Sequence, residues 1–459
     1  MKDRSNKVGI GRGAAYLYIE TITSMISGYF FWFILSKITT SAIIGTSSVI
    51  ISLAGIFSTI ASLGVQGGAQ RFLGKSLAEE RLEDSKEYIK TSLLVLSIGI
   101  TACSIVVLIF KSWLFKSFDF DITLLSILII GTSNISSLFR AIVISSINTK
   151  ILPLVSIVST ATKLALAIGL VLIGAGVFGV TFGYMSYFLI LTILLALPIA
   201  AIFKQTKGRP QISFGHYFKN IFTSSMVTWI PGSIATIGSQ LGPIVIIGVQ
   251  GASQAGYYFI AFSIFTAIFT LMSVLSGISY PALSAMYDGR KKFSWRMIRI
   301  NSVVVIPLSS SLLFYSKEIM GLFGREYSNG SSSLEILLLS MLPTAVMSGV
   351  SQLVYSYGNY KQTLIIGIIT NLSRTILYFT LVPIFYGGVG AALSYTIGTI
   401  IGFAISVLIS KKIGMLIFWK ELILVFCIPT GVAFILSFFG INYILGVVSV
   451  LIISYVLYI

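Results

Sequence analysis

The sequence predicts an all-α integral membrane protein with about 14 transmembrane helices. Apolar residues make up 56% of the 459 residues, charged residues only 10%, and the mean hydropathy is +0.97. A soluble domain carries charge on about a quarter of its residues, so an ordinary globular chain and a disordered chain are both excluded. The apolar excess extends over the whole length, which also excludes a protein with a single membrane anchor.

Fourteen apolar stretches are long enough to cross a bilayer, since a helical span needs about 20 apolar residues. Backbone groups that face lipid must be hydrogen bonded, so we expect each stretch to be a helix. The alternating patterns of a membrane barrel are absent from the sequence. The expected spans are residues 14–36, 41–64, 91–113, 122–147, 151–173, 178–203, 221–249, 254–280, 298–316, 333–357, 362–385, 388–410, 418–437 and 440–459.

The basic residues alternate between the connections of these spans. With the N-terminus inside, the inner connections and the N-terminal segment carry 23 of the 31 lysines and arginines, and the outer connections carry 5. Cytoplasmic loops are enriched in these residues, so we expect a multi-pass protein of the plasma membrane with both termini in the cytoplasm. This pattern also explains the net charge of +17, and we expect no nucleic-acid partner.

The two halves of the chain are related by a shift of 211 residues. Residues 148–184 match residues 359–395 at ten positions, which include two glycine pairs and one tyrosine pair: Gly176 with Gly387, Gly179 with Gly390, and Tyr184 with Tyr395. Six spans is an even number, so the repeat is expected to be parallel. The predicted organisation is an N-terminal six-helix lobe (1–203), a cytoplasmic linker (204–220), a C-terminal six-helix lobe (221–410) and two additional transmembrane helices (411–459).

Two segments follow the second span in the first half. Gly64–Lys75 (GVQGGAQRFLGK) contains small residues that allow close helix approach. Ser76–Lys90 has the charge density of a solvated or interfacial helix. Both are expected on the cytoplasmic side.

Two cations occupy related positions within the spans. Lys163 and Arg374 are paired by the 211-residue shift, and each lies 13 residues beyond a lysine of an inner loop, Lys150 or Lys361. At 1.5 Å per residue, both lie about 20 Å from that loop. A charge at this depth is costly, so the pair suggests one shared central anion site that binds substrate. The alternative is that each cation bonds locally to a helix carbonyl or extends towards the interface.

Two further basic residues are candidates for the same cationic cavity, and one acid is a candidate partner of these cations. Arg140 lies nearer to the inner end of its span, where it would line the cavity mouth or make a structural contact. Arg71 would lie at the inner entrance or act as an ordinary membrane anchor. Glu20 is the acid deep in the first span, and it is a candidate for an ion pair with one of the cations or for a coupled protonation step.

Several kinds of chemistry are not indicated. His216 is the single histidine, and Cys103 and Cys427 lie far apart in apolar runs, so no metal site or disulfide framework is indicated. The sequence has no phosphate-binding G-x-x-x-x-G-K-[ST] loop. We therefore expect no cofactor and no enzyme activity. A membrane-embedded glycan ligase or polymerase is the enzyme-class alternative, and the short outer loops with dispersed acids disfavour it.

Three segments carry a family resemblance. They are Gly64–Gly74 (GVQGGAQRFLG), Leu322–Leu339 (LFGREYSNGSSSLEILLL) and Asn359–Tyr395. With the fourteen spans in a 6+6+2 layout, they resemble the polysaccharide-exporter branch of the multidrug/oligosaccharidyl-lipid/polysaccharide (MOP) superfamily. This branch includes Wzx-type flippases, and the superfamily has a MATE-like fold.

The resemblance implies a flippase that moves a polyprenyl-linked glycan from the inner to the outer leaflet by alternating access. Its partners would be the lipid-linked oligosaccharide, membrane lipid and enzymes of glycan assembly. A cationic cavity would bind the phosphate of the lipid, and Arg71 is the position that the family motif matches. A MATE-like cation or drug antiporter is the alternative, but such a protein needs carboxylates and the spans offer only Glu20.

Overall fold

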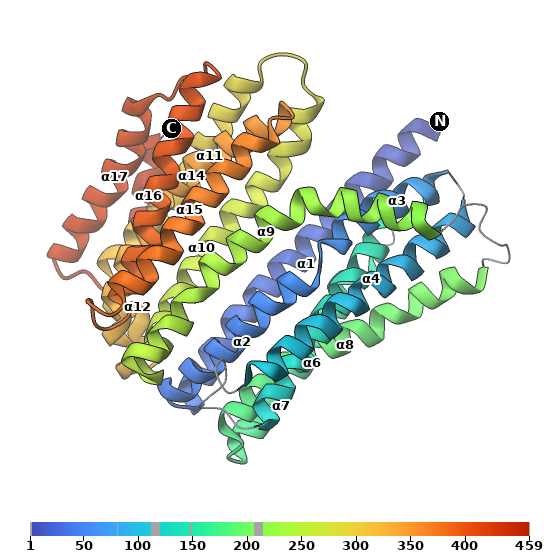
Figure 1. Cartoon of the computed structure of the whole chain (residues 1–459). Helices are drawn as coiled ribbons and strands as arrows, with labels where there is room; N and C mark the ends of the chain where they lie inside the picture. Colours follow the sequence, from blue (N-terminus) through green and yellow to red (C-terminus); the bar gives the residue numbers. More distant parts are fainter. Residues whose placement is uncertain (1, 80, 112–119, 147–148, 206–213, 459) are drawn as a thin grey trace. The chain divides into compact units, whose positions relative to one another are not determined.

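The computed structural model describes residues 2–79, 81–111, 120–146, 149–205 and 214–458. These residues form helices joined by turns, and none of them lies in a β-strand. Figure 1 follows the helices in chain order. They are α1 (Lys2–Ile38), α2 (Ser41–Ala61), α3 (Val65–Ala78), α4 (Leu82–Ile109), α6 (Phe120–Ser145), α7 (Ile151–Leu172), α8 (Gly176–Gln205), α9 (Phe214–Gln250), α10 (Ala252–Ala285), α11 (Arg290–Phe314), α12 (Ser316–Gly321), a 3-10 helix η1 (Arg325–Gly330), α13 (Ser331–Leu338), α14 (Met341–Ser356), α15 (Tyr360–Leu381), α16 (Val389–Lys412), α17 (Trp419–Phe438) and α18 (Tyr443–Tyr458).

The predicted class of all-α multi-pass membrane protein is confirmed. Within the described residues, thirteen helices are long and apolar enough to cross a membrane. The fourteenth expected span, 440–459, corresponds to α18, whose 16 residues are fewer than a straight crossing requires. The expected span 333–357 consists of α13 and α14, which are separated at Leu339 and Ser340.

The helices form two compact units. The first unit contains Met1–Phe31 and Val49–Thr236, and the second contains Trp32–Ser48 and Ile237–Ile459. Three of the boundaries therefore fall within α1, α2 and α9, whereas the predicted lobes 1–203 and 221–410 were bounded by loops. Of the predicted linker 204–220, residues 206–213 lie outside the described residues; α8 extends to Gln205 and α9 begins at Phe214.

The secondary structure follows the 211-residue repeat closely. Shifting α1 by 211 residues gives 213–249, and α9 is Phe214–Gln250. Shifting α6 gives 331–356, which is the segment that α13 and α14 form together. The repeat that the sequence shows in 37 residues therefore extends to helices on which few identical residues remain.

Glycines related by the repeat also pack in the same way. A Cβ atom on Gly179 would lie 3.0 Å from the backbone nitrogen of Val171, and one on Gly390 would lie 2.7 Å from the Cα of Val382. Val171 and Val382 are themselves 211 residues apart. Such distances leave no room for a side chain, so glycine permits α8 to approach α7 in the first unit and α16 to approach α15 in the second.

A glycine pair within the second unit brings α2 and α10 together. Gly45 and Gly256 are again 211 residues apart. A Cβ on Gly45 would lie 2.7 Å from the nitrogen of Gly256, and a Cβ on Gly256 would lie 3.2 Å from the nitrogen of Gly45. The crossing is therefore nearly symmetric, because equivalent residues of equivalent helices contact each other.

The segment after α2 differs from the sequence expectation. We expected Ser76–Lys90 to form a solvated or interfacial helix, but α3 ends at Ala78 and α4 begins at Leu82. The two helices pack against each other, and the buried hydroxyls of Ser76 and Ser85 lie 2.7 Å apart and share a hydrogen bond. At the other end of α3, Leu63 and Gly64 have positive φ angles of 45° and 66°, which separate α3 from α2.

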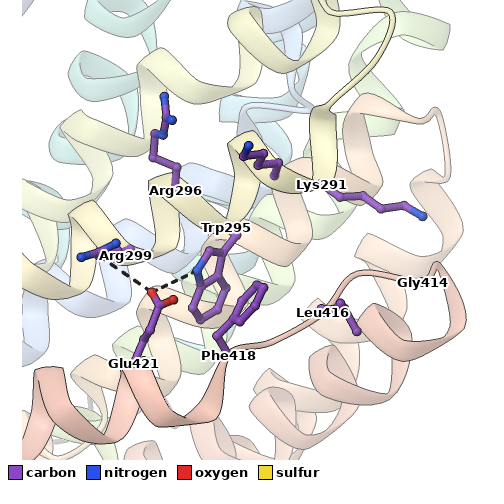
Figure 2. A pocket seen from close by; sticks show the side chains of 9 residues that line it. Lys291, Trp295, Arg296, Arg299, Gly414, Leu416, Phe418 and Glu421 are labelled. Carbon is purple, nitrogen blue, oxygen red and sulfur yellow. Dashed lines mark hydrogen bonds and ion pairs between the residues drawn. The ribbon is translucent and has the colours of Figure 1, made fainter.

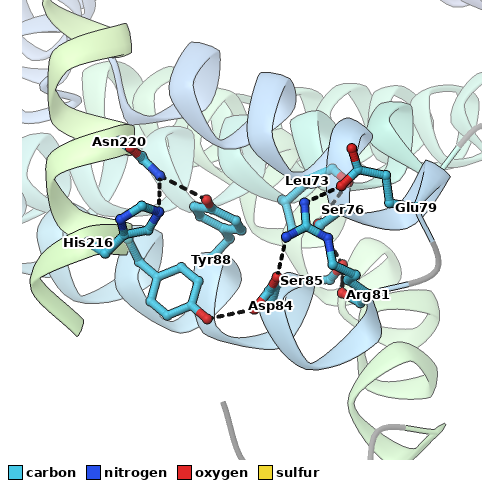
Figure 3. A network of polar contacts seen from close by, with 10 residues as sticks. Leu73, Ser76, Glu79, Arg81, Asp84, Ser85, Tyr88, His216 and Asn220 are labelled. Carbon is cyan, nitrogen blue, oxygen red and sulfur yellow. Dashed lines mark hydrogen bonds and ion pairs between the residues drawn. The ribbon is translucent and has the colours of Figure 1, made fainter. Parts of the chain in front are cut away.

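The α3–α4 hairpin is joined to the first turns of α9 by polar contacts (Figure 3). The buried Tyr217 hydroxyl donates to Asp84 Oδ1 at 2.7 Å, and Asn220 Nδ2 donates to the Tyr88 hydroxyl at 3.1 Å. Asp84 also pairs with Arg81 at 3.0 Å. Burial raises the pKa of the Tyr217 phenol, and the hydrogen bond to the Asp84 carboxylate raises it further. The N-terminal part of α9 is thus part of the first unit.

Candidate functional site

The first unit holds Lys163 near the middle of α7. The lysine is buried, with 6% of its surface exposed. Its Nζ lies 4.7 Å from the ring centre of Phe31 on α1 and 5.3 Å from that of Tyr187 on α8. No carboxylate of the described residues forms an ion pair with it. Lys163 is therefore a buried cation that is stabilised by aromatic faces and has no opposite charge beside it.

Hydroxyl groups extend from this lysine along the contact of α1 with α7. Ser27 donates to Thr160 at 2.9 Å, and the hydroxyls of Ser24 and Ser156 lie 3.0 Å apart. The Tyr187 hydroxyl lies 3.4 Å from that of Ser24. Hydrogen-bonded hydroxyls therefore lie along the contact of α1 with α7 that also holds the cation.

The same line of polar groups ends at an ion pair between Glu20 and Arg140. Glu20 accepts two hydrogen bonds from the guanidinium, from Nε to Oε1 and from Nη2 to Oε2, both 2.6 Å long. The carboxylate side chain is 6% exposed and that of Arg140 is 39% exposed. Both carboxylate oxygens are occupied by a fork-to-fork contact, so the two charges neutralise each other.

The second unit holds Arg374 in α15, and its environment is more polar. Arg374 is 8% exposed. Its Nη1 donates to Asn371 Oδ1 at 3.1 Å, and Nη2 donates to the Thr399 hydroxyl at 2.8 Å. The guanidinium carbon lies 3.7 Å from the ring centre of Tyr395 on α16. No ion pair to Arg374 occurs among the described residues, so this cation also lacks a carboxylate.

Neighbouring helices hold the partners of Arg374 in place. A Cβ on Gly238 of α9 would lie 2.7 Å from the Cβ of Asn371, so α9 packs directly on the residue that binds Nη1. A Cβ on Gly398 of α16 would lie 3.1 Å from the backbone nitrogen of Arg374. The phenols of Tyr258 and Tyr378 are buried in the same unit. The geometry is therefore that of a stacked, hydrogen-bonded arginine inside tight helix packing.

The candidate residues from the sequence fall into three places. Lys163, Glu20 and Arg140 lie in the first unit, where Tyr187 contacts Lys163 and its hydroxyl lies 3.4 Å from that of Ser24, about one helical turn from Glu20. Arg374 lies in the second unit. Arg71 is exposed on α3, where its guanidinium lies 5.6 Å from the ring centre of Phe72, and it does not join the buried group.

The sequence analysis missed the aromatic and amide partners of the two cations. One signal was available for Asn371, which lies three residues before Arg374 and therefore on the same helix face. Tyr395 was matched to Tyr184 by the repeat but was not connected with Arg374. Tyr187 gave no local signal, because it reaches Lys163 only when α7 and α8 are packed.

Comparison with known proteins gives the family. A sequence model of the family described as "Polysaccharide biosynthesis protein" (Polysacc_synt_3) matches residues 49–332, which is more than half of the chain. The chain belongs to this family. A search of curated protein sequences found no match.

Solved structures share the fold of this member of the polysaccharide biosynthesis family. A lipid II flippase, MurJ, in an inward closed conformation has a TM-score of 0.74 and 18% identity, over 96% of this chain and 98% of that chain. An inward-facing multidrug resistance MATE transporter of the MOP superfamily has a TM-score of 0.64 and 14% identity, over 87% and 98%. A MOP superfamily transporter from Pyrococcus furiosus has a TM-score of 0.58 and 13% identity, over 87% and 96%.

The solved structures confirm the predicted MATE-like fold, and the family model agrees with the predicted resemblance to a polysaccharide family. The proteins named in these structures are a flippase and transporters. The extra helices α17 and α18 lie beyond the 49–332 segment and beyond the repeat.

Proposed function

We propose that the protein is a flippase that moves a polyprenyl-phosphate- or polyprenyl-pyrophosphate-linked oligosaccharide from the cytoplasmic to the outer leaflet by alternating access. The glycan would be used to assemble a surface polysaccharide or glycoprotein glycans. The protein would lie in the plasma membrane with both termini in the cytoplasm, which the 23 to 5 distribution of basic residues favours. Its partners would be the lipid-linked oligosaccharide, membrane lipid and enzymes of glycan assembly.

This proposal rests on two buried cations that have no carboxylate partner among the described residues. Lys163 and Arg374 are almost fully buried within spans, and neither has a carboxylate beside it among the described residues. A charge in the middle of a membrane span costs about 2.5–3.5 kcal/mol on insertion scales. A phosphate or pyrophosphate group would supply the missing negative charge. The arginine fork suits phosphate oxygens, and lysine binds them as a point charge.

The remaining candidates are assigned supporting roles in this proposal. Arg140 would act at the cavity mouth, because its side chain is 39% exposed although Glu20 binds it. Arg71 would attract the head group at the cytoplasmic entrance, because it is exposed on α3. Glu20 would keep Arg140 neutralised between cycles, and its protonation would release the arginine and couple the step to protons.

A cation or drug antiporter of the same superfamily fits these residues less well. Such a transporter needs a carboxylate that is free to bind a cation. Glu20 lies deep in the first unit, and both of its oxygens accept hydrogen bonds from Arg140. The two cations without carboxylate partners would repel a cationic substrate.

The proposal is tested first by depleting the protein from cells and analysing a lipid extract by mass spectrometry. A complete polyprenyl-linked glycan should accumulate while surface glycan falls, and its mass identifies the substrate. An unchanged glycolipid pool with new sensitivity to lipophilic cations would contradict the flippase and support the antiporter.

The role of the cations is tested in the same cells with the Lys163→Ala/Arg374→Ala variant. We expect export to fall by about tenfold or more, because the compensating charges for a buried phosphate are lost. The matched control is Lys317→Ala/Arg325→Ala, which removes the same charge from exposed positions. Wild-type export by the first variant at wild-type protein level would refute the anion site.

A further inference from the structure

A second group of basic residues lies in the second unit, at the start of α11, and the flippase proposal does not use it. Here α11, the segment between α16 and α17, and α17 enclose a cavity of about 520 Å³ (Figure 2). Four basic side chains, one tryptophan and one carboxylate determine its chemistry: Lys291, Lys292, Arg296, Arg299, Trp295 and Glu421.

Positive charge is in excess in this cavity. Glu421 is the one carboxylate that lines it among the described residues, and its Oε2 accepts from Trp295 Nε1 at 3.3 Å and lies 3.8 Å from Arg299 Nε. Figure 2 shows both contacts converging on this oxygen. No described carboxylate pairs with Lys291, Lys292 or Arg296. Three cations therefore remain available to bind an anion.

An apolar hollow of about 430 Å³ continues from this charged cavity. Arg296 and Arg299 line both spaces. The other lining residues of the hollow are aliphatic or aromatic and come from α11, α17 and α18: Ile300, Val303, Val304, Val425, Tyr455 and Tyr458. The charged cavity therefore lies at the end of a membrane span, and the apolar hollow follows that span inwards.

A charged cavity that continues into an apolar hollow fits a phospholipid. A free phosphate ion would need only the charged cavity, whereas a phospholipid presents a phosphate joined to acyl chains. Lysine and arginine at the cytoplasmic end of a span attract anionic lipid head groups, and tryptophan is enriched at that level. The long arginine side chains can follow the boundary between the two environments.

We infer that this cavity binds the phosphate head group of an anionic glycerophospholipid, with an acyl chain in the apolar hollow. Lys291, Lys292 and Arg296 bind the head group, and α17 and α18 supply the opposite wall. The site is built by α11 together with the two helices outside the repeat, and neither Lys163 nor Arg374 lines it. The bound lipid would contact α11, α17 and α18 and so stabilise the packing of the last two helices on α11.

The test uses the purified full-length protein and native mass spectrometry with added phosphatidylglycerol or phosphatidylcholine. The wild type should bind phosphatidylglycerol preferentially. In the Lys291→Gln/Lys292→Gln/Arg296→Gln variant, binding should weaken by about fivefold for each basic residue removed. The matched control is Lys75→Gln/Lys150→Gln/Lys219→Gln, which removes three exposed charges of the first unit and should change binding by less than about twofold.

A second variant tests the apolar part without changing charge. Val303→Phe places a ring in the hollow and should also weaken phosphatidylglycerol binding, while thermal unfolding reports whether either variant is folded. Equal binding of both lipids to the wild type, or equal losses in the triple variant and its control, would overturn the site. If polyprenyl phosphate binding falls in the triple variant and phosphatidylglycerol binding does not, the occupant is the transport substrate and the inference is wrong.

Discussion

The buried cations of the two units occupy equivalent places in the repeat but are stabilised in different ways. Lys163 contacts two aromatic rings and makes no hydrogen bond within the described residues. Arg374 stacks on Tyr395 and donates two hydrogen bonds, to Asn371 and Thr399. Among the described residues, the cation of the first unit is therefore stabilised by contacts with aromatic rings alone, and the cation of the second unit is also hydrogen bonded to side chains of α15 and α16.

The difference follows from the chemistry of the two side chains. A guanidinium has five N–H donors in a plane and can stack while it donates, whereas an ammonium is a compact charge. Arg374 is thus expected to contribute to the stability of its unit, and Lys163 is expected to reduce that of its own. A phosphate ligand would gain most at Lys163, because no described residue accepts a hydrogen bond from its ammonium group.

The largest expected effect is the loss of export when either cation is substituted, and the free energy of unfolding should distinguish the two substitutions. Lys163→Met should lower export by about tenfold or more without lowering the free energy of unfolding, because an isolated buried charge is replaced by an apolar side chain. Arg374→Met should lower export and also lower the free energy of unfolding by about 3 kcal/mol, since two hydrogen bonds to a charged group are lost.

Export assays and thermal unfolding of the purified variants measure the two quantities. Arg374→Lys is the control that keeps the charge but loses the fork, and it should remain destabilised. The comparison fails if Lys163→Met and Arg374→Met lose the same stability.

The next effect concerns the acid that neutralises a third cation in the first unit. Glu20→Gln should lower the free energy of unfolding by about 2 kcal/mol, because Arg140 is left without its carboxylate. The value is below the value of about 3–5 kcal/mol for a fully buried pair because the Arg140 side chain is 39% exposed.

The double variant Glu20→Gln/Arg140→Gln removes both charges and should recover most of this loss. Denaturant unfolding in detergent measures all three proteins. No recovery in the double variant would mean that the two residues act independently and that their ion pair contributes little.

A smaller effect tests whether equivalent packing has equivalent energy. Gly179→Ala and Gly390→Ala should each lower the free energy of unfolding by about 1–3 kcal/mol, because the added methyl group meets the backbone of the preceding helix. The Gly390 substitution should cost more, since its Cβ would contact the carbonyl oxygen of Leu381. Melting temperatures of the two variants decide this order, and Gly431→Ala is a control, because nothing lies within 4 Å of its Cβ position.

The smallest expected effect on the free energy of unfolding concerns the hydrogen bond between Tyr217 and Asp84 in the first unit. Tyr217→Phe removes the hydrogen bond to Asp84 and should cost about 1 kcal/mol. The pKa of Tyr217 is raised in the folded protein, so its contribution is present below the ordinary tyrosine pKa of about 10 and is lost as pH rises above that value. Unfolding measured from pH 8 to 11 should show less decline for Tyr217→Phe than for the wild type, and parallel curves would contradict this assignment.

Much of the fold could be predicted from the sequence because its cause is local. Each span reveals itself by about 20 apolar residues, since lipid requires every backbone group to be bonded within the helix. The repeat was detectable because a few residues, such as Gly179 and Gly390, are needed at the same close approach in both halves. The buried cations could be located for the same reason, as a charge in an apolar run is conspicuous.

Only the tertiary structure decided which groups these charges meet. Glu20 binds a residue 120 positions away, and Tyr187 reaches Lys163 from another helix. The tertiary structure also assigned Trp32–Ser48 to the second unit and placed α17 beside the basic residues at the start of α11. Hydropathy describes how favourably each residue enters the bilayer. Helices of similar composition have similar hydropathy, so this quantity does not distinguish one apolar helix from another. The choice of neighbours depends on the fit of side chains between distant helices, and no local pattern carries that information.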